Sequence, residues 1–441
     1  MPTARSAVAG FSPLDDELGL LPGHLTPSLF ESVVRLGTWM PFLPAAKMVA
    51  AFTRVDLSKP TARRLTEGAG QAYVEVQAAQ VATIERDLPA SPAGPAIQQM
   101  SVDGAMVPLV HKEWTEVKTL AIGTVGAPSG AKGEIRTMDL SYFSRLADAA
   151  TFTRLATVET HRRGTEKAGR VCAIVDGAEW AQTFIDMQCP EAVRIPDWGH
   201  AAEYVVAAAQ AILGAGTAAT SDWLSVQLQE LRHGDPDTVL EAVRSLPQAV
   251  PEDALSEEAR AVVAGSLAYL EKRREQIRYA EFAAQGYPIG SGAVESANKL
   301  VVEARMKGAG MHWEREYVDP MLALRTIACS DRWEEDWPLI VDRLREQVRE
   351  RAAARRSERS ACGEKRADAV TEEVAGTVEA LEPIAVEGEA ERDLVQEPQT
   401  LPVPHKRLGA GPRRPAADHP WRHMPIGRAA WRQQPAVPAE R

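Results

Sequence analysis

The sequence predicts an α/β protein in which a mixed sheet is flanked by helices and interrupted by an all-helical block. Short runs rich in Val, Ile, Leu and Thr alternate with helix-periodic segments between residues 97 and 202, which is typical of α/β cores. Residues 203–284 are rich in Ala, Glu, Leu and Arg and hold no convincing strand pattern. A Gly-rich turn then leads into further helices, so residues 285–350 are predicted to complete the core.

Length and composition are those of a water-soluble protein. The chain has 441 residues, enough for two or three domains, with 45% apolar and 25% charged residues. No run approaches the ~18 apolar residues of a membrane helix, and the N-terminus lacks an apolar signal core. The four cysteines form no Cys-x-x-Cys pair, which argues against a disulfide framework or zinc cluster. We therefore expect a cytoplasmic protein that does not contact membranes.

The charge is unevenly distributed. The net charge of −11 argues mildly against a nucleic-acid binder. Residues 362–398 hold eleven acids and three bases, whereas residues 399–441 hold eight bases and two acids. The remainder is still acidic, so any DNA-binding groove must be a local basic patch.

Residues 26–90 are predicted to be helical, after an N-terminal arm at 1–25. A helix is expected to begin near Ser58 or Thr61 as N-cap, with Arg63 and Arg64 in its first turn. This pattern resembles a helix-turn-helix, whose second helix enters the major groove of DNA. The alternative is a helical bundle that leaves the arginine pair in solvent.

The predicted core elements follow in order. Residues 91–96 read as a linker, and the two apolar runs after it read as paired strands. The remaining predictions are a third strand near 134–143, a helix over 142–162, strands near 169–177 and 192–197, each followed by a helix, and helices over 316–352. From about residue 353 the low hydrophobicity predicts a disordered tail.

Two aspartates stand in strand contexts. Asp103 in SVDGAMV interrupts an apolar strand, where a carboxylate is costly to bury without a partner; a β-turn at Asp-Gly is the alternative. Asp176 in VCAIVDG follows a run typical of a strand buried on both faces, at the strand end where α/β sheets bind ligands. Capping of the next helix is its alternative role.

Further polar residues lie near predicted helix starts. Asp197 and His200 in IPDWGH suit a metal site or, more simply, a helix cap with a packed histidine. Glu295 in GYPIGSGAVESANK falls in a first helical turn, where a carboxylate commonly compensates the helix dipole. A basic stretch follows, which suits phosphate contact and base stacking or a solvated helix face: Lys299, Arg305, Lys307, His312 and the adjacent Trp313.

Asp103, Asp176 and Glu295 are more informative together than singly. Mg²⁺ prefers carboxylate oxygens, and two such ions ~3.5–4 Å apart can activate a nucleophile and stabilise a leaving oxygen in phosphoryl transfer. Three acids on two strands and one helix therefore form a candidate catalytic and metal-binding set for two Mg²⁺ or Mn²⁺ ions.

These motifs together resemble the bacterial insertion-sequence transposases of the ISKra family, distant relatives of the Mutator-like DDE transposases. The resemblance rests on SVDGAMV, IVDGAEW, IPDWGH and the GYPIGSGAVESANKLVVEARMKGAGMHW block, with support from residues 25–67 and the terminal DHPWRH. It implies an RNase H-like core in which Asp103, Asp176 and Glu295 form a DDE triad. Asp197 and His200 match a supporting motif, and 203–284 matches the helical insertion.

The resemblance also implies a function. A transposase would cleave DNA at transposon ends, join it to target DNA, act as a homo-oligomer on DNA and associate with the nucleoid. Members often carry a longer N-terminus with a Cys-x-x-Cys element, so we expect this chain to be N-terminally short. The alternatives are an inactive relic that only binds DNA and a nuclease that cuts without joining.

Overall fold

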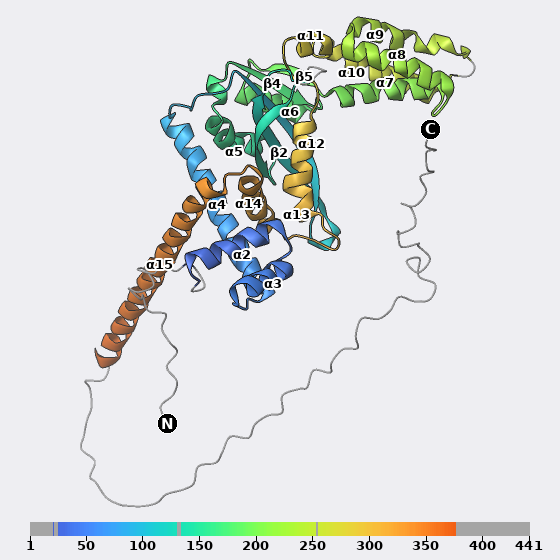
Figure 1. Ribbon diagram of the computed structural model, residues 1–441. Helices are drawn as coiled ribbons and strands as arrows, with labels where there is room; N and C mark the ends of the chain where they lie inside the picture. Colours follow the sequence, from blue (N-terminus) through green and yellow to red (C-terminus); the bar gives the residue numbers. More distant parts are fainter. Residues whose placement is uncertain (1–20, 22–24, 130–133, 253–254, 376–441) are drawn as a thin grey trace, which may run out of the picture. The chain divides into compact units, whose positions relative to one another are not determined.

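A mixed sheet forms the centre of the computed structural model, which describes residues 21, 25–129, 134–252 and 255–375, with side chains to 355 and at 357. The strand order is β3-β2-β1-β4-β5, and Figure 1 labels β2, β4 and β5 of this sheet. The first three strands pair antiparallel, whereas β4 pairs parallel with both β1 and β5. The strands are β1 (Ile97–Pro108), β2 (Trp114–Val125), β3 (Thr137–Arg145), β4 (Arg170–Val175) and β5 (Val193–Pro196).

Strand β4 shows why the apolar pattern produces a central strand. Val171, Ala173 and Val175 join one hydrophobic cluster, and Cys172 and Ile174 join another. Successive side chains of a strand point to opposite faces, so a continuous apolar run suits a strand buried on both sides. The predicted strand with two buried faces is confirmed.

Helices cover both faces of the sheet. On one face, α5 (Ala149–Arg162) and α6 (Glu179–Gln188) pack through Phe152 and Phe184 against residues of β1 and β2. The opposite cluster joins β1 and β2 to a layer of helices and a π-helical segment. Among these are α2 (Pro27–Trp39), α4 (Lys59–Asp87), α12 (Gly292–Ala297), η5 (Asn298–Glu303), α13 (Ala304–Met306) and α14 (Val318–Cys329).

The N-terminal helices share this core. Ser58 caps α4 as predicted, because its side chain accepts a hydrogen bond from the Thr61 N–H. Helix α4 packs closely on α14, and a Cβ on Gly70 would lie 2.2 Å from the Pro320 carbonyl oxygen. With α2 and α3 (Phe42–Thr53), α4 therefore forms a layer of the same unit, Met1–Ala367, rather than a separately packed domain.

The described part of residues 203–284 is helical and contains no strand, as predicted. Its apolar side chains form their own cluster, which continues onto Cys172, Ile174 and Ile195 of the sheet. The helices of this insertion are α7 (Trp198–Leu213), α8 (Ala218–His233), α9 (Pro236–Ser245), α10 (Glu257–Lys272) and α11 (Tyr279–Ala284).

Two boundary predictions are wrong. Residues 142–145 belong to β3 rather than to a helix, because pairing with β2 continues to Arg145. Helix α15 (Trp333–Ala375) continues through residues 353–375, for which disorder was predicted. An Ala-, Arg- and Glu-rich segment has high helix propensity even without apolar residues to bury. Most of the arm at 1–25 and the tail at 376–441 lie outside the described residues.

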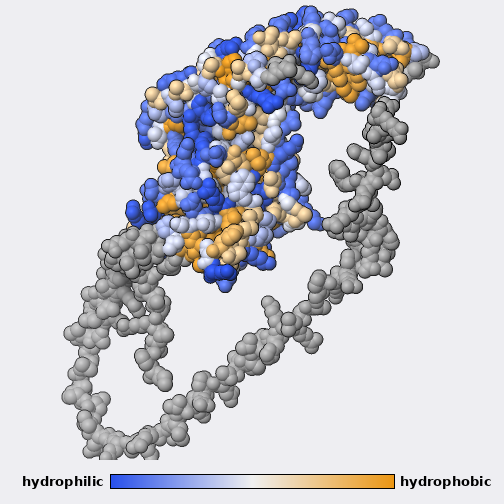
Figure 2. Space-filling model, viewed as in Figure 1, coloured by the Kyte–Doolittle hydropathy of each residue, from blue (hydrophilic) through white to orange (hydrophobic). Residues whose placement is uncertain are grey.

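The surface is predominantly polar on the face shown in Figure 2, with separate apolar patches. Among the described helices, none combines the length and apolar content needed to cross a bilayer.

Candidate functional site

Asp103 lies in the middle of β1, so the alternative of a β-turn at Asp-Gly is wrong. Its side chain is half-buried on the sheet face that also carries Ala105 and Val107. The Gly104 N–H donates to Oδ1 (2.7 Å), and the Asn298 amide donates to Oδ2 (2.8 Å). Both carboxylate oxygens are therefore held in fixed directions.

Asp176 directly follows β4 and lies beside Asp103. The parallel ladder pairs Ile97 with Arg170 and Met100 with Ala173, and the same register continued three residues sets Asp103 opposite Asp176. Asp176 Oδ1 accepts a hydrogen bond from the Ala178 N–H (2.9 Å). The carboxylate thus orders the start of α6 while remaining at the end of the strand.

Glu295 projects from the first turn of α12 and is exposed. The Ser291 hydroxyl donates to its Oε1 (3.0 Å). Asn298 lies three residues later on the same helical face and reaches Asp103, which fixes α12 against β1. Glu295 is consequently held near the two aspartates by its own helix.

The Glu295 helix continues as the π-helix η5, a rare geometry frequent at functional sites. The carbonyl groups of Leu300 and Val301 in this segment accept hydrogen bonds from Arg325, which is almost completely buried. Arg325 also donates to the Thr38 carbonyl (3.4 Å), so it joins η5, α14 and α2. The sequence did not single out Arg325 because nothing in its local pattern marks it.

The three predicted carboxylates lie within electrostatic reach of one another. Burial raises the pKa of Asp103, and the negative charges of Asp176 and Glu295 raise it further against the lowering effect of the Gly104 and Asn298 hydrogen bonds. In the described part of the chain, no three acidic, histidine or cysteine side chains are close enough to form a ready-made metal site. The arrangement is a cluster of like charges rather than a closed coordination shell.

Asp197 supports the Glu295 helix. Its Oδ1 accepts a hydrogen bond from the His200 N–H (2.8 Å) and caps α7. The helix cap is one of the two roles predicted for Asp197 from the sequence. Its Oδ2 accepts from the Ser291 N–H, and Ser291 in turn holds Glu295. Asp197 is buried and therefore connects the end of β5 with the Gly-rich turn before α12.

His200 packs into an aromatic cluster. Its ring lies edge-on to Tyr204 and Tyr269, and its Nδ1 is 3.2 Å from a carboxylate oxygen of Glu203. The Tyr204 and Tyr269 rings stack with centroids 3.8 Å apart. These contacts match the packed-histidine alternative.

The helical insertion holds the turn that carries Asp176. The Tyr269 hydroxyl donates to the Asp176 carbonyl (2.9 Å), and Arg273 Nη2 donates to the Gly177 carbonyl (2.8 Å). Gly177 has φ +89°, and a Cβ there would lie 2.7 Å from Arg273 Nε. Sequence reasoning missed Tyr269 and Arg273 because they lie more than ninety residues after the turn they bind.

Tyr269→Phe removes one of these hydrogen bonds while retaining the ring stack. We expect faster amide exchange at residues 176–178 and a loss of about 1 kcal/mol in the free energy of unfolding. Hydrogen exchange and denaturant titration measure the two effects. Tyr204→Phe is the matched control, because the Tyr204 hydroxyl makes no hydrogen bond to the described residues. Equal effects of both variants would contradict this role for Tyr269.

The basic stretch after Glu295 divides into exposed and buried residues. Lys299 and His312 are exposed, and Lys307 pairs with Glu303 (2.7 Å). Arg305 and Trp313 are buried, so neither is exposed on the surface for the predicted phosphate contact and base stacking. Arg305 donates to the Gly37 carbonyl (3.0 Å), and the Trp313 indole donates to Met306 (3.1 Å), so tertiary packing uses both side chains.

The two arginines in the first turns of α4 also differ. Arg63 pairs with Glu67 (2.8 Å), and its guanidinium lies over the Tyr317 ring at 4.9 Å. Arg64 is exposed and forms no hydrogen bond or ion pair with the described residues. A helix-turn-helix role for this region remains a prediction, with Arg64 as the residue more accessible to phosphate.

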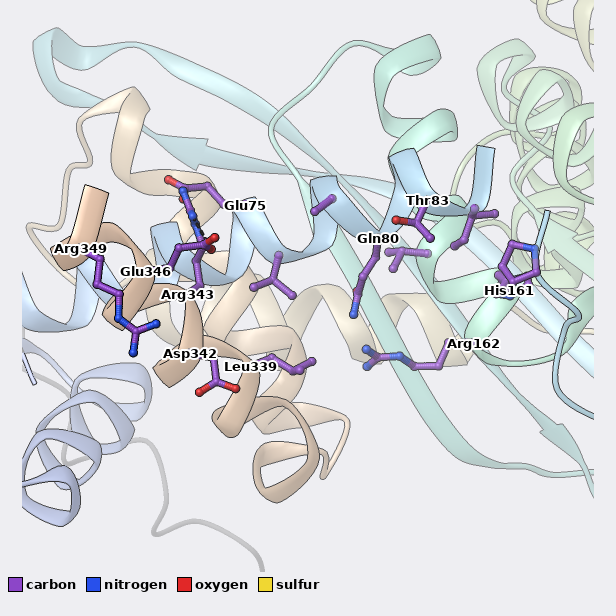
Figure 3. Close-up of a pocket in the computed structure, with 15 residues that line it drawn as sticks. Glu75, Gln80, Thr83, His161, Arg162, Leu339, Asp342, Arg343, Glu346 and Arg349 are labelled. Atoms are coloured by element: carbon purple, nitrogen blue, oxygen red, sulfur yellow. Dashed lines mark hydrogen bonds and ion pairs between the residues drawn. The ribbon is translucent and has the colours of Figure 1, made fainter. Parts of the chain in front are cut away.

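A separate cavity of about 950 Å³ lies between α4, α5 and α15 (Figure 3). Arg343 on its wall pairs with Glu75, Glu346 and Glu350. None of the candidate site residues lines this cavity, and its charges are largely matched internally. It therefore has no evident part in the carboxylate site.

The chain was also compared with known proteins. Neither a scan against protein-family models nor a search of curated proteins found a match. The candidate site consequently rests on the geometry of its residues.

Proposed function

We propose that this protein is a DNA transposase, a metal-dependent polynucleotidyl transferase that uses Asp103, Asp176 and Glu295. The observation that carries the proposal is the convergence of these acids from three separate segments. The β1–β4 register aligns the two aspartates, and the hydrogen bond from Asn298 to Asp103 holds the Glu295 helix beside them.

The fold supports the proposal in outline. A mixed sheet carries the two aspartates on neighbouring strands, and the all-helical insertion separates them in sequence from the glutamate. We propose that this sheet is the RNase H-like core implied by the family resemblance. The insertion also contributes to the site, because its Tyr269 and Arg273 bind the Asp176–Gly177 turn.

The chemistry of the three side chains fits Mg²⁺ or Mn²⁺. Carboxylate oxygens are the ligands these hard cations prefer, and a cation would offset the mutual repulsion that raises the pKa of Asp103. The Asn298 Oδ1 atom is buried without a hydrogen-bond partner, a further oxygen beside Asp103. Glu295 is exposed, and among the described residues its side chain bonds to Ser291 alone, so its carboxylate is free to turn toward the aspartates.

Each residue then has a distinct part in the reaction. When bound, the metal ions would supply Lewis acidity to the nucleophile and the leaving oxygen of the DNA phosphodiester. Asp103 is oriented by Gly104 and Asn298, and Asp176 by the turn that Tyr269 holds. Lys299, exposed one turn after Glu295, would contact a DNA phosphate.

Metal removal tests the proposal directly. The full-length protein is incubated with a plasmid carrying its gene and native flanking DNA, together with a second target plasmid. We expect nicked and joined products with Mg²⁺ or Mn²⁺, none in excess chelator, and recovery when the metal is restored. Cleavage without joining would indicate a nuclease. DNA binding with no metal-dependent cleavage would indicate an inactive relic and contradict the proposed activity.

The proposed partners and place in the cell follow from this activity. The substrate would be DNA at both transposon ends and at the target, which requires a homo-oligomer able to hold two ends. Association with the nucleoid is the corresponding expectation. Sedimentation of the protein with and without its flanking DNA measures the oligomer.

A further inference from the structure

A second cavity, of about 480 Å³, lies where the starts of α3 and α4 meet the loop before Trp313. Its volume is within the range of pockets that bind small ligands. Apolar side chains, Leu43 and Met311 among them, form part of the wall, and Lys59, Arg63 and His312 form another. The cavity therefore combines apolar surface with a lining of net positive charge, in which Lys59, Arg63 and Arg305 outnumber Glu67 and Glu314.

Two further polar groups line this cavity. Arg305 is 2% exposed, and its Nη2 atom has no hydrogen-bond partner in the structure. An unpartnered buried donor costs free energy, and such groups commonly belong to ligand sites. The buried Glu67 carboxylate also lines the cavity. A carboxylate beside the basic side chains disfavours a simple anion such as phosphate. It favours a ligand that carries both hydrogen-bond donors and acceptors along one edge.

A DNA base attached to its backbone has these properties. Its faces suit the apolar wall, its edge presents donors and acceptors, and its phosphate suits the basic rim. The start of α4 adds the positive end of a 29-residue helix, with Lys59 as its first residue. A paired base inside a duplex cannot enter such a cavity, because its faces are covered by its neighbours.

The cavity is connected to the carboxylate site by β1 and by the Glu295 helix. The Val110 N–H, beyond the end of β1, donates to the Trp313 carbonyl (3.0 Å) beside the cavity. Asp103 and Val110 are seven residues apart, along the last part of β1 and the two residues that follow it, a path of roughly 20 Å. One DNA strand covers that length in about six nucleotides at 3.4 Å each.

We propose that the cavity between α3, α4 and residues 310–314 binds one unpaired nucleotide of the DNA about six nucleotides from the scissile phosphate. This inference rests on the proposed DNA-processing function and adds to it a site for an unstacked base. Leu43 and Met311 contact the base, Glu67 and Arg305 face its edge, and Lys59 contacts the adjoining phosphate.

Binding of three DNA forms tests this site separately from catalysis. The full-length chain carries Asp176→Asn to prevent cleavage, and fluorescence anisotropy is measured with blunt duplex, duplex with an eight-nucleotide single-stranded tail, and single strand from the gene flank. We expect the tailed duplex to bind about ten-fold more tightly than the blunt duplex at the same salt concentration.

Leu43→Glu places a charge at the mouth of the cavity on a side chain that is 46% exposed, so folding should be preserved. We expect it to remove the preference for the tailed duplex and leave blunt-duplex binding unchanged. Leu339→Glu, at a leucine 37% exposed on α15, is the matched control and should retain the preference. Arg64→Ala should weaken binding of all three DNA forms by a similar factor, because it would remove only a phosphate contact.

The outcomes separate this site from the proposed catalysis. Equal binding of blunt and tailed duplex by the parent, or a preference that survives Leu43→Glu, would overturn the nucleotide site even if metal-dependent cleavage is found. A preference that Leu43→Glu removes would support the site even if no cleavage is found. Failure to bind any DNA would overturn both proposals.

Discussion

Asp103→Asn, Asp176→Asn and Glu295→Gln should each reduce metal-dependent DNA cleavage by about 10³-fold or more. Each substitution retains the size of the side chain but removes the negative charge and one oxygen of a carboxylate in the proposed metal site. Loss of several kcal/mol of transition-state charge stabilisation corresponds to a factor of this order. The measurement is the initial rate of nicking of a plasmid with the native flanks.

Glu179→Gln is the matched control for Glu295→Gln. Glu179 also lies in the first turn of a helix, α6, and is exposed three residues after Asp176. A carboxylate that only compensates a helix dipole should give little effect on cleavage when neutralised. Similar losses in both variants would mean that Glu295 has no special part in the reaction.

Stability provides a second readout that does not depend on activity. Because the pKa of Asp103 is raised in the folded protein, its ionised form opposes folding at neutral pH. In chelator, Asp103→Asn should therefore leave the thermal midpoint unchanged or raise it. Mn²⁺ should raise the midpoint of the parent and not that of Asp103→Asn, since a ligand that binds only the folded state stabilises it. A large loss of stability in chelator would instead indicate a structural aspartate.

Arg332→Met should destabilise the fold by about 3–5 kcal/mol, because removing one partner of a buried ion pair leaves the other charge buried without compensation. Arg332 donates to both carboxylate oxygens of Glu159 at 2.8 Å, and Glu159 is 1% exposed. The same loop-to-helix region includes Asp336, which is also buried and pairs with Arg162 (3.0 Å). Denaturant unfolding at neutral pH measures the change.

Arg154→Met is the control for this substitution. Arg154 also forms two hydrogen bonds to one carboxylate, that of Glu85, at 2.6 Å, but both side chains are exposed. Water and salt screen such a pair, so little change in stability is expected. A loss as large as that of Arg332→Met would show that burial does not explain the difference.

The same pair predicts a pH dependence. Burial acts to raise the pKa of Glu159, but the charge and hydrogen bonds of Arg332, with the charge of Arg162, outweigh it and hold that pKa below its usual value. In the parent, the ionised Glu159 carboxylate stabilises the fold at pH values above the usual pKa of a glutamate. This stabilisation is lost as the pH falls through the lowered pKa of Glu159 in the folded protein. Without Arg332, burial should raise the pKa of Glu159, so acid should stabilise the variant. The stability gap between parent and variant should therefore shrink as the pH falls toward 4.

Local sequence pattern was sufficient for most elements of the fold. The apolar run before Asp176 predicts a strand with two buried faces, and Ser58 and Asp197 mark helix starts because a side-chain oxygen caps the first free N–H groups. Such signals depend only on neighbours within a few residues. The same pattern placed Asp103 within a strand and Asp176 at a strand end, which are two of the three candidate carboxylates.

Long-range contacts decided the rest. Arg305 and Trp313 resemble a DNA-binding pair in sequence, yet packing against α2 and α3 buries them. Residues 353–375 remain helical although their composition predicted disorder, because helix propensity does not require a core.

The carboxylate cluster shows this division most clearly. Each acid, taken alone, suits a turn, a cap or a dipole partner, and no local signal joins them. The β1–β4 register and the hydrogen bond from Asn298 to Asp103 bring them together, over separations of 73 residues or more in the chain. Residue type and local spacing determine which groups can carry charge on a strand or helix end. Only the pairing of distant strands and helices determines which of those charges meet, because that pairing depends on burying apolar faces far apart in the sequence.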